Sequence, residues 1–148
     1  MDVKIQIVKE DSPELVEIKC HKVTSDVNEI VAFVKSRQGQ LTGSADGKYY
    51  EIPVVNLYYI EAVDNRVFLY DAKQVYETKK KLYELEELLA EKNFLRISKS
   101  ILLNLMKVKA IKPAFNGRFI AILASGEEII ISRKYVPNLK NKLKEGKV

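Results

Sequence analysis

The sequence predicts a mainly β protein of the α+β class, in which an antiparallel β body follows a β-β-α extension. Apolar runs from residue 40 onward are mostly short and end at turn signals, as strands do. Asn116-Gly117 is the strongest short hairpin signal in the chain, and Asp46-Gly47 is a second tight-turn signal. A length of 148 residues suits one domain with a small extension.

The extension begins with a predicted hairpin. Val3, Ile5 and Ile7 alternate with polar residues, which is the pattern of a half-buried strand. Residues 11–13 form a turn signal, and residues 15–20 are predicted to return as a second strand.

A helix is predicted after this hairpin. Its apolar residues recur at the spacing of one helical face, at Val27, Ile30, Val31 and Val34. Thr24 or Ser25 can cap its N-terminus, and Gly39 marks its end. We therefore predict an N-terminal extension over residues 1–41, which packs on the body or on a second copy, and a β-rich domain over residues 42–148.

The β-rich domain is predicted to hold short strands and two helices. Strands are expected at residues 49–52, 57–62, 67–70, 72–78, 108–112, 119–123 and 128–132. A helix over residues 80–92 carries an apolar stripe that suits core packing, formed by Leu82, Leu85, Leu88 and Leu89. A short terminal helix is expected over residues 136–143.

Charge is divided unevenly along the chain. Residues 96–148 carry twelve Lys and Arg against three Asp and Glu, a net charge of +9, and residues 1–95 carry thirteen against seventeen, a net charge of −4. A basic half suggests contact with a polyanion. A solvated basic surface with a lysine-rich tail explains the same counts, so charge alone leaves both readings open.

The sequence shows no catalytic or metal-binding constellation. His21 is the only histidine and Cys20 the only cysteine, so this pair lacks the further ligands that a metal needs. GxGxxG and phosphate-loop motifs are absent. We therefore expect a protein that is not an enzyme and uses no cofactor. A single cysteine, no signal peptide and no apolar run of ~20 residues predict a cytoplasmic protein without membrane insertion.

Cations lie beside serines in two strand-like segments, residues 94–104 and residues 129–135, and a turn at residues 64–66 adds an amide and an arginine. Lys and Arg supply charge to phosphates, Arg also reads guanine, and Ser donates to phosphate oxygens. The candidate DNA-binding residues are Asn65, Arg66, Arg96, Ser98, Lys99, Ser100, Ser132, Arg133 and Lys134.

These segments resemble the LytTR DNA-binding domain of bacterial transcription regulators. The family's pattern is matched in order and spacing by Arg96-Ile97, Ser100, Leu103-Asn104 and Ser132-Arg133-Lys134-Tyr135. Its upstream elements are matched by Tyr59-Ile60-Glu61-Ala62 and by the helix from Leu82 to Leu89. The resemblance covers about residues 42 to 146, with five motifs in register.

The resemblance implies an elongated, mostly antiparallel LytTR-like β fold in three sheets with a helix between them. It implies that loops, and not a recognition helix, contact double-stranded DNA across two successive major grooves and the minor groove between them. By position, Asn65 or Arg66, Lys99 and Arg133 belong to these loops. We expect Lys99 to hold a phosphate and Arg133 to read a base.

We therefore expect a transcription regulator that binds duplex DNA as a homodimer, with two copies on repeated half-sites. Many members of the family carry a phospho-receiver domain before the DNA-binding domain, and the extension of forty-odd residues is too short to be one. The sequence does not say whether another protein regulates this one. An RNA-binding β module and a protein–protein interaction module with an incidental basic face remain as alternatives.

Overall fold

The structure, a computed structural model, describes residues 1–144, without the side chains of residues 32 and 35–38. The chain divides into two compact units, Met1–Val34 and Lys35–Val148. The boundary predicted between residues 41 and 42 lies a little further along the chain and stays a prediction. The last four residues of the predicted β-rich domain lie outside the described residues.

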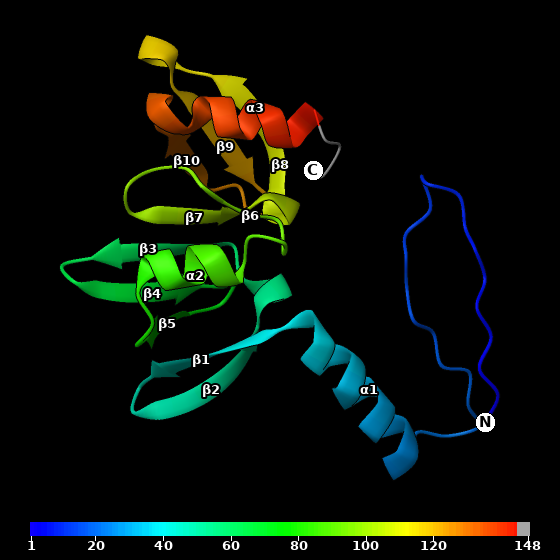
Figure 1. Ribbon diagram of the computed structural model, residues 1–148. Coiled ribbons are helices and arrows are strands. Elements are labelled where there is room, and N and C mark those ends of the chain that lie inside the picture. The colour runs from blue at the N-terminus through cyan, green and yellow to red at the C-terminus, as the bar shows by residue number, and fades with distance from the viewer. Residues whose placement is uncertain (145–148) are drawn as a thin grey trace. The chain divides into compact units, whose positions relative to one another are not determined.

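The larger unit is built mainly from short antiparallel strands (Figure 1). The strands are β1 (Gln40–Ala45), β2 (Lys48–Pro53), β3 (Tyr59–Val63), β4 (Arg66–Tyr70), β5 (Val75–Thr78), β6 (Phe94–Arg96), β7 (Ile101–Asn104), β8 (Val108–Pro113), β9 (Phe119–Leu123) and β10 (Glu128–Ile131). The helices are α1 (Ser25–Gln38), α2 (Leu82–Leu88) and α3 (Val136–Lys144). Short 3-10 turns lie at η1 (Val54–Asn56), η2 (Leu105–Lys107), η3 (Phe115–Gly117) and η4 (Arg133–Tyr135).

The described strands form two sheets, ordered β2-β1-β5-β4-β3-β7-β6 and β10-β9-β8, and every pairing is antiparallel. The predicted mainly β, antiparallel fold is confirmed. The number of sheets differs from the expected three, because the β1–β2 hairpin joins the larger sheet through one residue pair, Ser44 with Glu77.

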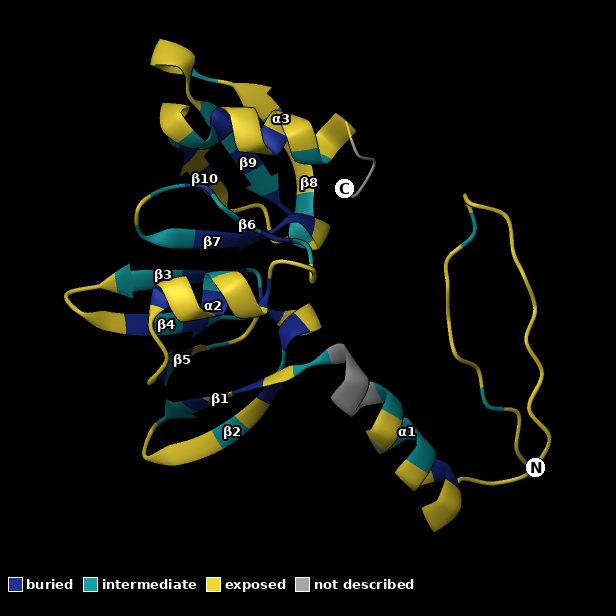
Figure 2. Ribbon diagram, viewed as in Figure 1, coloured by how far each residue is buried: buried dark blue, intermediate teal, exposed yellow. Residues whose placement is uncertain are grey.

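Strands β3 and β7 separate two hydrophobic cores. Side chains alternate across a strand, so neighbouring residues face opposite sides of the sheet. Ile60 and Leu102 enter the core that α2 covers, whereas Tyr59 and Leu103 enter the core that β8–β10 and α3 cover. Figure 2 shows the buried stretches along these strands. The two strands therefore hold the loops at their ends on a framework buried on both faces.

Helix α2 is shorter than the predicted helix over residues 80–92. Leu82, Leu85 and Leu89 are buried in the core, as predicted. Leu88 is 56% exposed, so its assignment to the core stripe is wrong. Its position lies away from the face that the other three leucines share at a period of 3.6 residues.

The predicted helix α1 begins in the smaller unit and ends in the first residues of the larger one. The Thr24 hydroxyl accepts a hydrogen bond from the Val27 N–H (3.3 Å), and Gly39 follows the helix with a positive φ of 92°. The two strands predicted before α1 are not formed in residues 1–24, all of which the structure describes. The physical reason is that a lone two-stranded hairpin with an uncovered apolar face is marginally stable in water.

Candidate nucleic-acid interface

Four loop segments lie along one edge of the larger unit, at the left of Figure 1. They are the β3–β4 turn, the N-terminal end of α2, the β6–β7 turn and η4 with the residue before it. These segments comprise residues 64–66, 79–81, 97–100 and 132–135, and we call them together the loop edge. Every predicted DNA-binding residue except Arg96 belongs to the loop edge, and Arg96 immediately precedes it.

The β3–β4 turn presents Asn65 at its tip. Asp64 and Asn65 both have positive φ, 51° and 64°, which is the requirement of a type I′ hairpin turn and a conformation that Asp and Asn tolerate. Arg66 is paired with Glu77 across β4 and β5, with Nη2–Oε1 at 2.6 Å and Nε–Oε2 at 3.1 Å. The hydrogen bond from Arg66 lowers the pKa of the Glu77 carboxyl. Asn65 is thus the freer of the two predicted contacts in this turn.

The Arg96 side chain stabilises the β6–β7 turn through hydrogen bonds within the protein. Its Nε donates to the Ser98 carbonyl (2.9 Å), its Nη2 donates to the Lys99 carbonyl, and its Nη1 pairs with Glu86 of α2 (2.7 Å). The side chain is only 19% exposed. All three guanidinium nitrogens are engaged within the protein, so the geometry favours a positioning role for Arg96.

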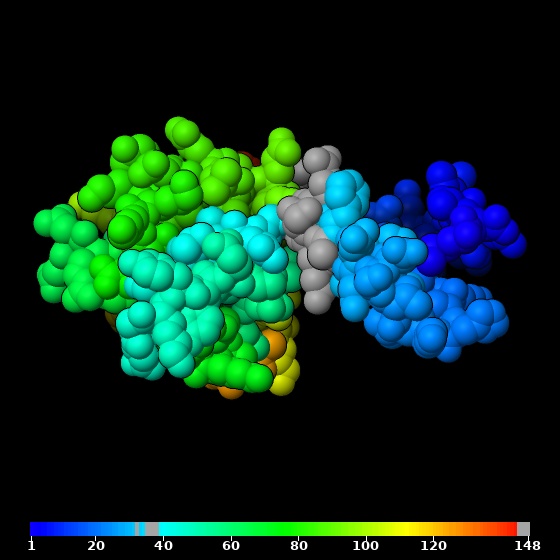
Figure 3. All heavy atoms as spheres, turned by 90° about the horizontal axis from the view of Figure 1, so that it is seen from below, coloured from blue at the N-terminus to red at the C-terminus, as the bar shows by residue number. Residues whose placement is uncertain are grey.

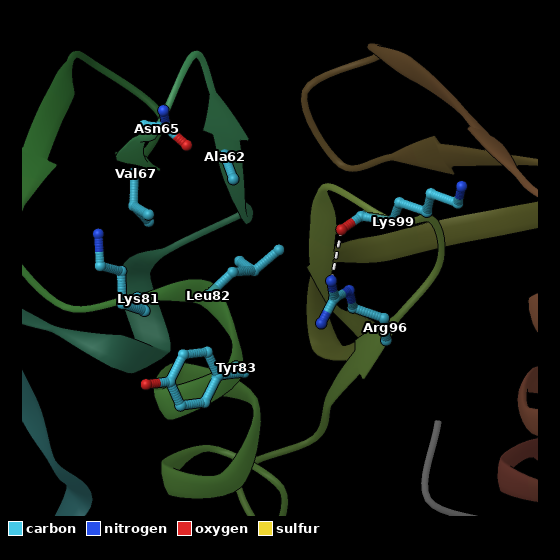
Figure 4. A pocket seen from close by; sticks show the side chains of 8 residues that line it. All are labelled: Ala62, Asn65, Val67, Lys81, Leu82, Tyr83, Arg96 and Lys99. Atoms are coloured by element: carbon cyan, nitrogen blue, oxygen red, sulfur yellow. Dashed lines mark hydrogen bonds between the residues drawn. The ribbon is translucent and has the colours of Figure 1, made fainter.

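The β6–β7 turn itself holds Lys99 outward. The Ser98 hydroxyl oxygen accepts from the Ser100 N–H (3.2 Å), and the Ser100 carbonyl accepts from the Ala62 N–H of β3 (2.8 Å). Lys99 is exposed, and Figure 4 shows its side chain running away from the Arg96 guanidinium. The turn is therefore fixed at both ends while its single cation faces solvent.

The segment that carries Arg133 and Lys134 is hydrogen-bonded to this turn. The Ser132 N–H donates to the Ile97 carbonyl (2.9 Å), which links the end of β10 to the start of the β6–β7 turn. Arg133 and Lys134 follow in η4 and are exposed. Arg133 lies against Gly117 of η3, where an added Cβ would come within 3.0 Å of the Arg133 Cδ.

A hollow of about 250 Å³ lies in the loop edge (Figure 4). Its lining residues are Ala62, Asn65, Val67, Lys81, Leu82, Tyr83, Arg96 and Lys99. Sequence reasoning missed Lys81. The signal was the run Lys79-Lys80-Lys81 directly before α2, because acidic residues and not lysines suit the start of a helix. Lys81 therefore adds a cation from a third segment to the hollow that Asn65 and Lys99 also line.

The loop edge lies within the part of the chain that matches a protein-family model. Residues 47–144 match the family model of the LytTr DNA-binding domain. The chain belongs to the LytTR DNA-binding domain family. Its structure is also similar to the LytTr DNA-binding domain of a methyl-accepting/DNA response regulator from Bacillus cereus, with a TM-score of 0.67 and 25% identity, covering 70% of this chain and 95% of that one.

Two kinds of relative share the LytTR region. The chain is 28% identical over 98 residues to the sensory transduction protein LytT of Enterococcus faecalis, which covers 66% of this chain and 40% of that protein. It spans about 40% of the length of such LytT relatives. It is 25% identical over 145 residues to an uncharacterized HTH-type transcriptional regulator of Staphylococcus aureus, covering 97% of this chain and 98% of that protein.

Two further observations concern the described part of the chain. None of its helices has the length and apolar character that a bilayer-spanning helix requires. Among residues 1–144, no group of three or more His, Cys, Asp or Glu residues is placed to hold a metal ion.

Proposed function

We propose that the chain is a sequence-specific transcription regulator that binds double-stranded DNA through the loop edge, with two copies on repeated half-sites. The observation that carries the proposal is the convergence of exposed cations from segments far apart in sequence, at Lys81, Lys99, Arg133 and Lys134. Basic side chains along one edge can neutralise phosphates along a duplex. Membership of the LytTR family and the similarity to a Staphylococcus transcriptional regulator support the same function.

Within this proposal we assign base contacts and phosphate contacts to different side chains. Arg133 reads a base, since a guanidinium can donate two hydrogen bonds to guanine O6 and N7. Lys99, Lys134 and Lys81 hold phosphates. Ser98 accepts a backbone hydrogen bond, and its hydroxyl lies 3.5 Å from the Ser100 hydroxyl, so this pair of serines can donate to a phosphate oxygen. Asn65, at the tip of the β3–β4 turn, contacts a groove of the DNA.

The proposal also covers the organisation of the whole chain. Residues 42–148 form the DNA-binding domain, and residues 1–41 form an extension. The protein acts in the cytoplasm and catalyses no reaction.

Selection of bound sequences from a random duplex pool tests the function directly. We expect a motif that occurs twice, with its copies about one helical turn of DNA, ~10 base pairs, apart. Recovery of no preferred sequence would contradict specific binding. Competition of a labelled duplex against single-stranded RNA separates DNA from RNA recognition, because salt dependence alone reports phosphates in both cases.

A further inference from the structure

The η3 loop between β8 and β9 holds a phenylalanine that the fold leaves almost fully exposed. Phe115 is 83% exposed, more than any other Phe or Tyr among the described residues. A single exposed apolar residue is common on protein surfaces, so its surroundings decide whether it has a role.

The backbone of the η3 loop is closed by two hydrogen bonds. The Arg118 N–H donates to the Phe115 carbonyl (3.3 Å), and the Ala114 N–H donates to the Arg118 carbonyl (2.8 Å). Asn116 and Gly117 between them both have positive φ, 60° and 75°. Phe115 is thus presented on a constrained backbone, and a partner that contacts its ring has little chain to order.

The η3 loop lies next to the loop edge. Hydrogen bonds join β3 to the β6–β7 turn, and that turn to the residue before η4. Arg133 of η4 in turn lies against Gly117 of η3. Figure 1 shows η3, in yellow, beside η4 at the upper left, and Figures 1 and 3 show the β3–β4 turn, in green, projecting at the left of the larger unit. The β3–β4 turn and η3 are therefore the two ends of one row of loops.

The charge around η3 suits a polyanion. Residues 92–126 contain seven Lys and Arg and no Asp or Glu. Arg118, directly after η3, is exposed, and among the described residues no carboxylate forms an ion pair with it. Arg133 and Lys134 of the neighbouring η4 are exposed as well. A duplex that contacts Arg133 therefore reaches the surface of η3.

DNA offers apolar surface that a phenylalanine ring can contact. Deoxyribose presents C–H groups along the backbone, and thymine presents its methyl group in the major groove, where Phe is one of the side chains that contact it. A protein partner would also offer apolar surface, but it would leave the exposed arginines of η3 and η4 without phosphates. Charge complementarity and the continuity with the loop edge thus favour DNA.

We propose that η3 is a fifth segment of the DNA interface, in which Phe115 packs on C–H groups of the duplex and Arg118 holds a phosphate. The inference rests on the proposed function, because it extends the same interface by one loop.

Binding of the full chain to its selected duplex tests the Phe115 contact. We expect Phe115→Ala to weaken binding about tenfold through lost apolar burial, and Phe115→Leu to keep most of the affinity. The matched control is Met106→Ala, which removes a 65% exposed apolar side chain from η2, at the opposite end of β8. Wild-type affinity of Phe115→Ala, or an equal loss in Met106→Ala, would overturn the proposal.

The salt dependence of binding tests Arg118. Arg118→Ala should flatten the slope of log affinity against log salt by about one unit, because one phosphate contact is removed. An unchanged slope would overturn the phosphate contact of Arg118.

Replacement of thymine by uracil distinguishes the two sources of C–H groups. If Phe115 contacts a thymine methyl, uracil at one position should weaken binding of the wild type and not of Phe115→Ala. If Phe115 contacts deoxyribose, no uracil position does so, and Phe115→Ala weakens selected and random duplexes alike.

Cross-linking tests the contact directly. The photoreactive residue p-benzoylphenylalanine in place of Phe115 should cross-link to the duplex on irradiation, and the same residue in place of Met106 should not. Cross-links from position 115 to protein alone would overturn the proposal.

Lys99→Ala separates a failure of this inference from a failure of the proposed function. If the wild-type chain selects no sequence and Lys99→Ala changes nothing, the proposed function fails. If Lys99→Ala weakens binding as expected and Phe115→Ala does not, binding through the loop edge stands and only the contribution of η3 is overturned.

Discussion

The Arg96 guanidinium lies 2.7 Å from the Glu86 carboxylate, and this ion pair joins the β6–β7 turn to helix α2. The same guanidinium donates to the carbonyls of Ser98 and Lys99. Because the Arg96 side chain is largely buried, these hydrogen bonds are shielded from water and hold the turn in one conformation. Arg96 thereby controls where Lys99 points.

Arg96→Ala separates this positioning role from a direct DNA contact. We expect a loss of about 1–3 kcal/mol in the free energy of unfolding, typical of hydrogen bonds to a charged group. DNA affinity should also fall, because Lys99 is no longer held in place, and this loss should largely disappear in a Lys99→Ala background. Arg96→Lys should restore little, since an ammonium cannot reproduce the planar guanidinium fork. An equal loss of affinity in the wild-type and Lys99→Ala backgrounds would show that Arg96 touches the DNA itself.

Arg133→Ala is expected to reduce discrimination between bases. The affinity for the selected duplex should fall by about 1–3 kcal/mol, and the preference at one base-pair position should relax. Lys73→Ala is the matched control, because it removes an exposed cation from the β4–β5 turn at the opposite end of β4. Competition binding with selected and random duplexes measures both effects. If Arg133→Ala weakened the two duplexes equally, the base contact assigned to Arg133 would be wrong.

Lys99→Ala and Lys81→Ala are expected to weaken all duplexes alike. Each substitution removes one phosphate contact, so each should flatten the salt slope by about one unit without changing the preferred sequence. Titrations at several salt concentrations measure the slope. The interpretation of Lys81 as part of the interface fails if its substitution leaves the slope at the wild-type value while Lys99→Ala changes it.

Gly117→Ala is expected to displace the Arg133 side chain, although the two residues lie in different loops. Gly117 has a φ of 75°, and an added Cβ would lie 3.2 Å from the Arg133 Cγ and 3.0 Å from its Cδ. Gly126→Ala is the control, because Gly126 also has a positive φ, 92°, but no atom within 4 Å of the added Cβ. Both variants should lose about 1 kcal/mol of stability from backbone strain. Only Gly117→Ala should alter base preference, and an equal effect of both on binding would contradict this contact.

Alkaline pH is expected to weaken the packing of the core that β8–β10 and α3 cover. The Tyr59 ring stacks on Tyr70 at 4.4 Å, and its hydroxyl donates to Glu127 at 3.0 Å. Burial, followed by the hydrogen bond to Glu127, raises the pKa of Tyr59, and burial also raises the pKa of Tyr70. The folded protein therefore holds these protons more tightly than the unfolded chain. Unfolding releases them above the ordinary tyrosine pKa of about 10, so stability should fall as pH rises past that value.

Denaturant unfolding of wild type and Tyr59→Phe between pH 9 and 11 measures this effect. The wild-type free energy of unfolding should fall more steeply with pH than that of Tyr59→Phe, which keeps the ring but has no proton to release. Parallel curves for the two proteins would show that Tyr59 does not contribute to the alkaline loss.

Local patterns predicted much of the fold. The hairpin formed by β3 and β4 was expected from apolar runs around a polar turn, and the structure confirms it with Asp64 and Asn65 in the left-handed conformation. The β8–β9 hairpin was also expected, but Asn116 and Gly117 lie in a longer loop than a two-residue turn. A turn signal indicates where the chain reverses and does not determine how many residues the reversal takes.

Sequence patterns were less informative for residues whose surroundings are formed by other segments of the chain. Leu88 continued a leucine-rich stripe in sequence, but only tertiary packing decides which side of a short helix meets the core. Lys81 was missed because its neighbours in the loop edge, Asn65 and Lys99, come from other segments. The burial of Arg96 depends likewise on Glu86, ten residues earlier.

The sequence by itself determined most strands of the larger unit, where the chain reverses, the family and the basic character of residues 96–148, because these depend on residue type and local spacing. The tertiary structure alone decided which of the basic residues are free. Arg66 and Arg96 are held by Glu77 and Glu86, whereas Lys99 and Arg133 are exposed. The physical reason is that a cation's availability depends on which carboxylates and carbonyls the fold brings within hydrogen-bonding distance, and those partners lie on other elements.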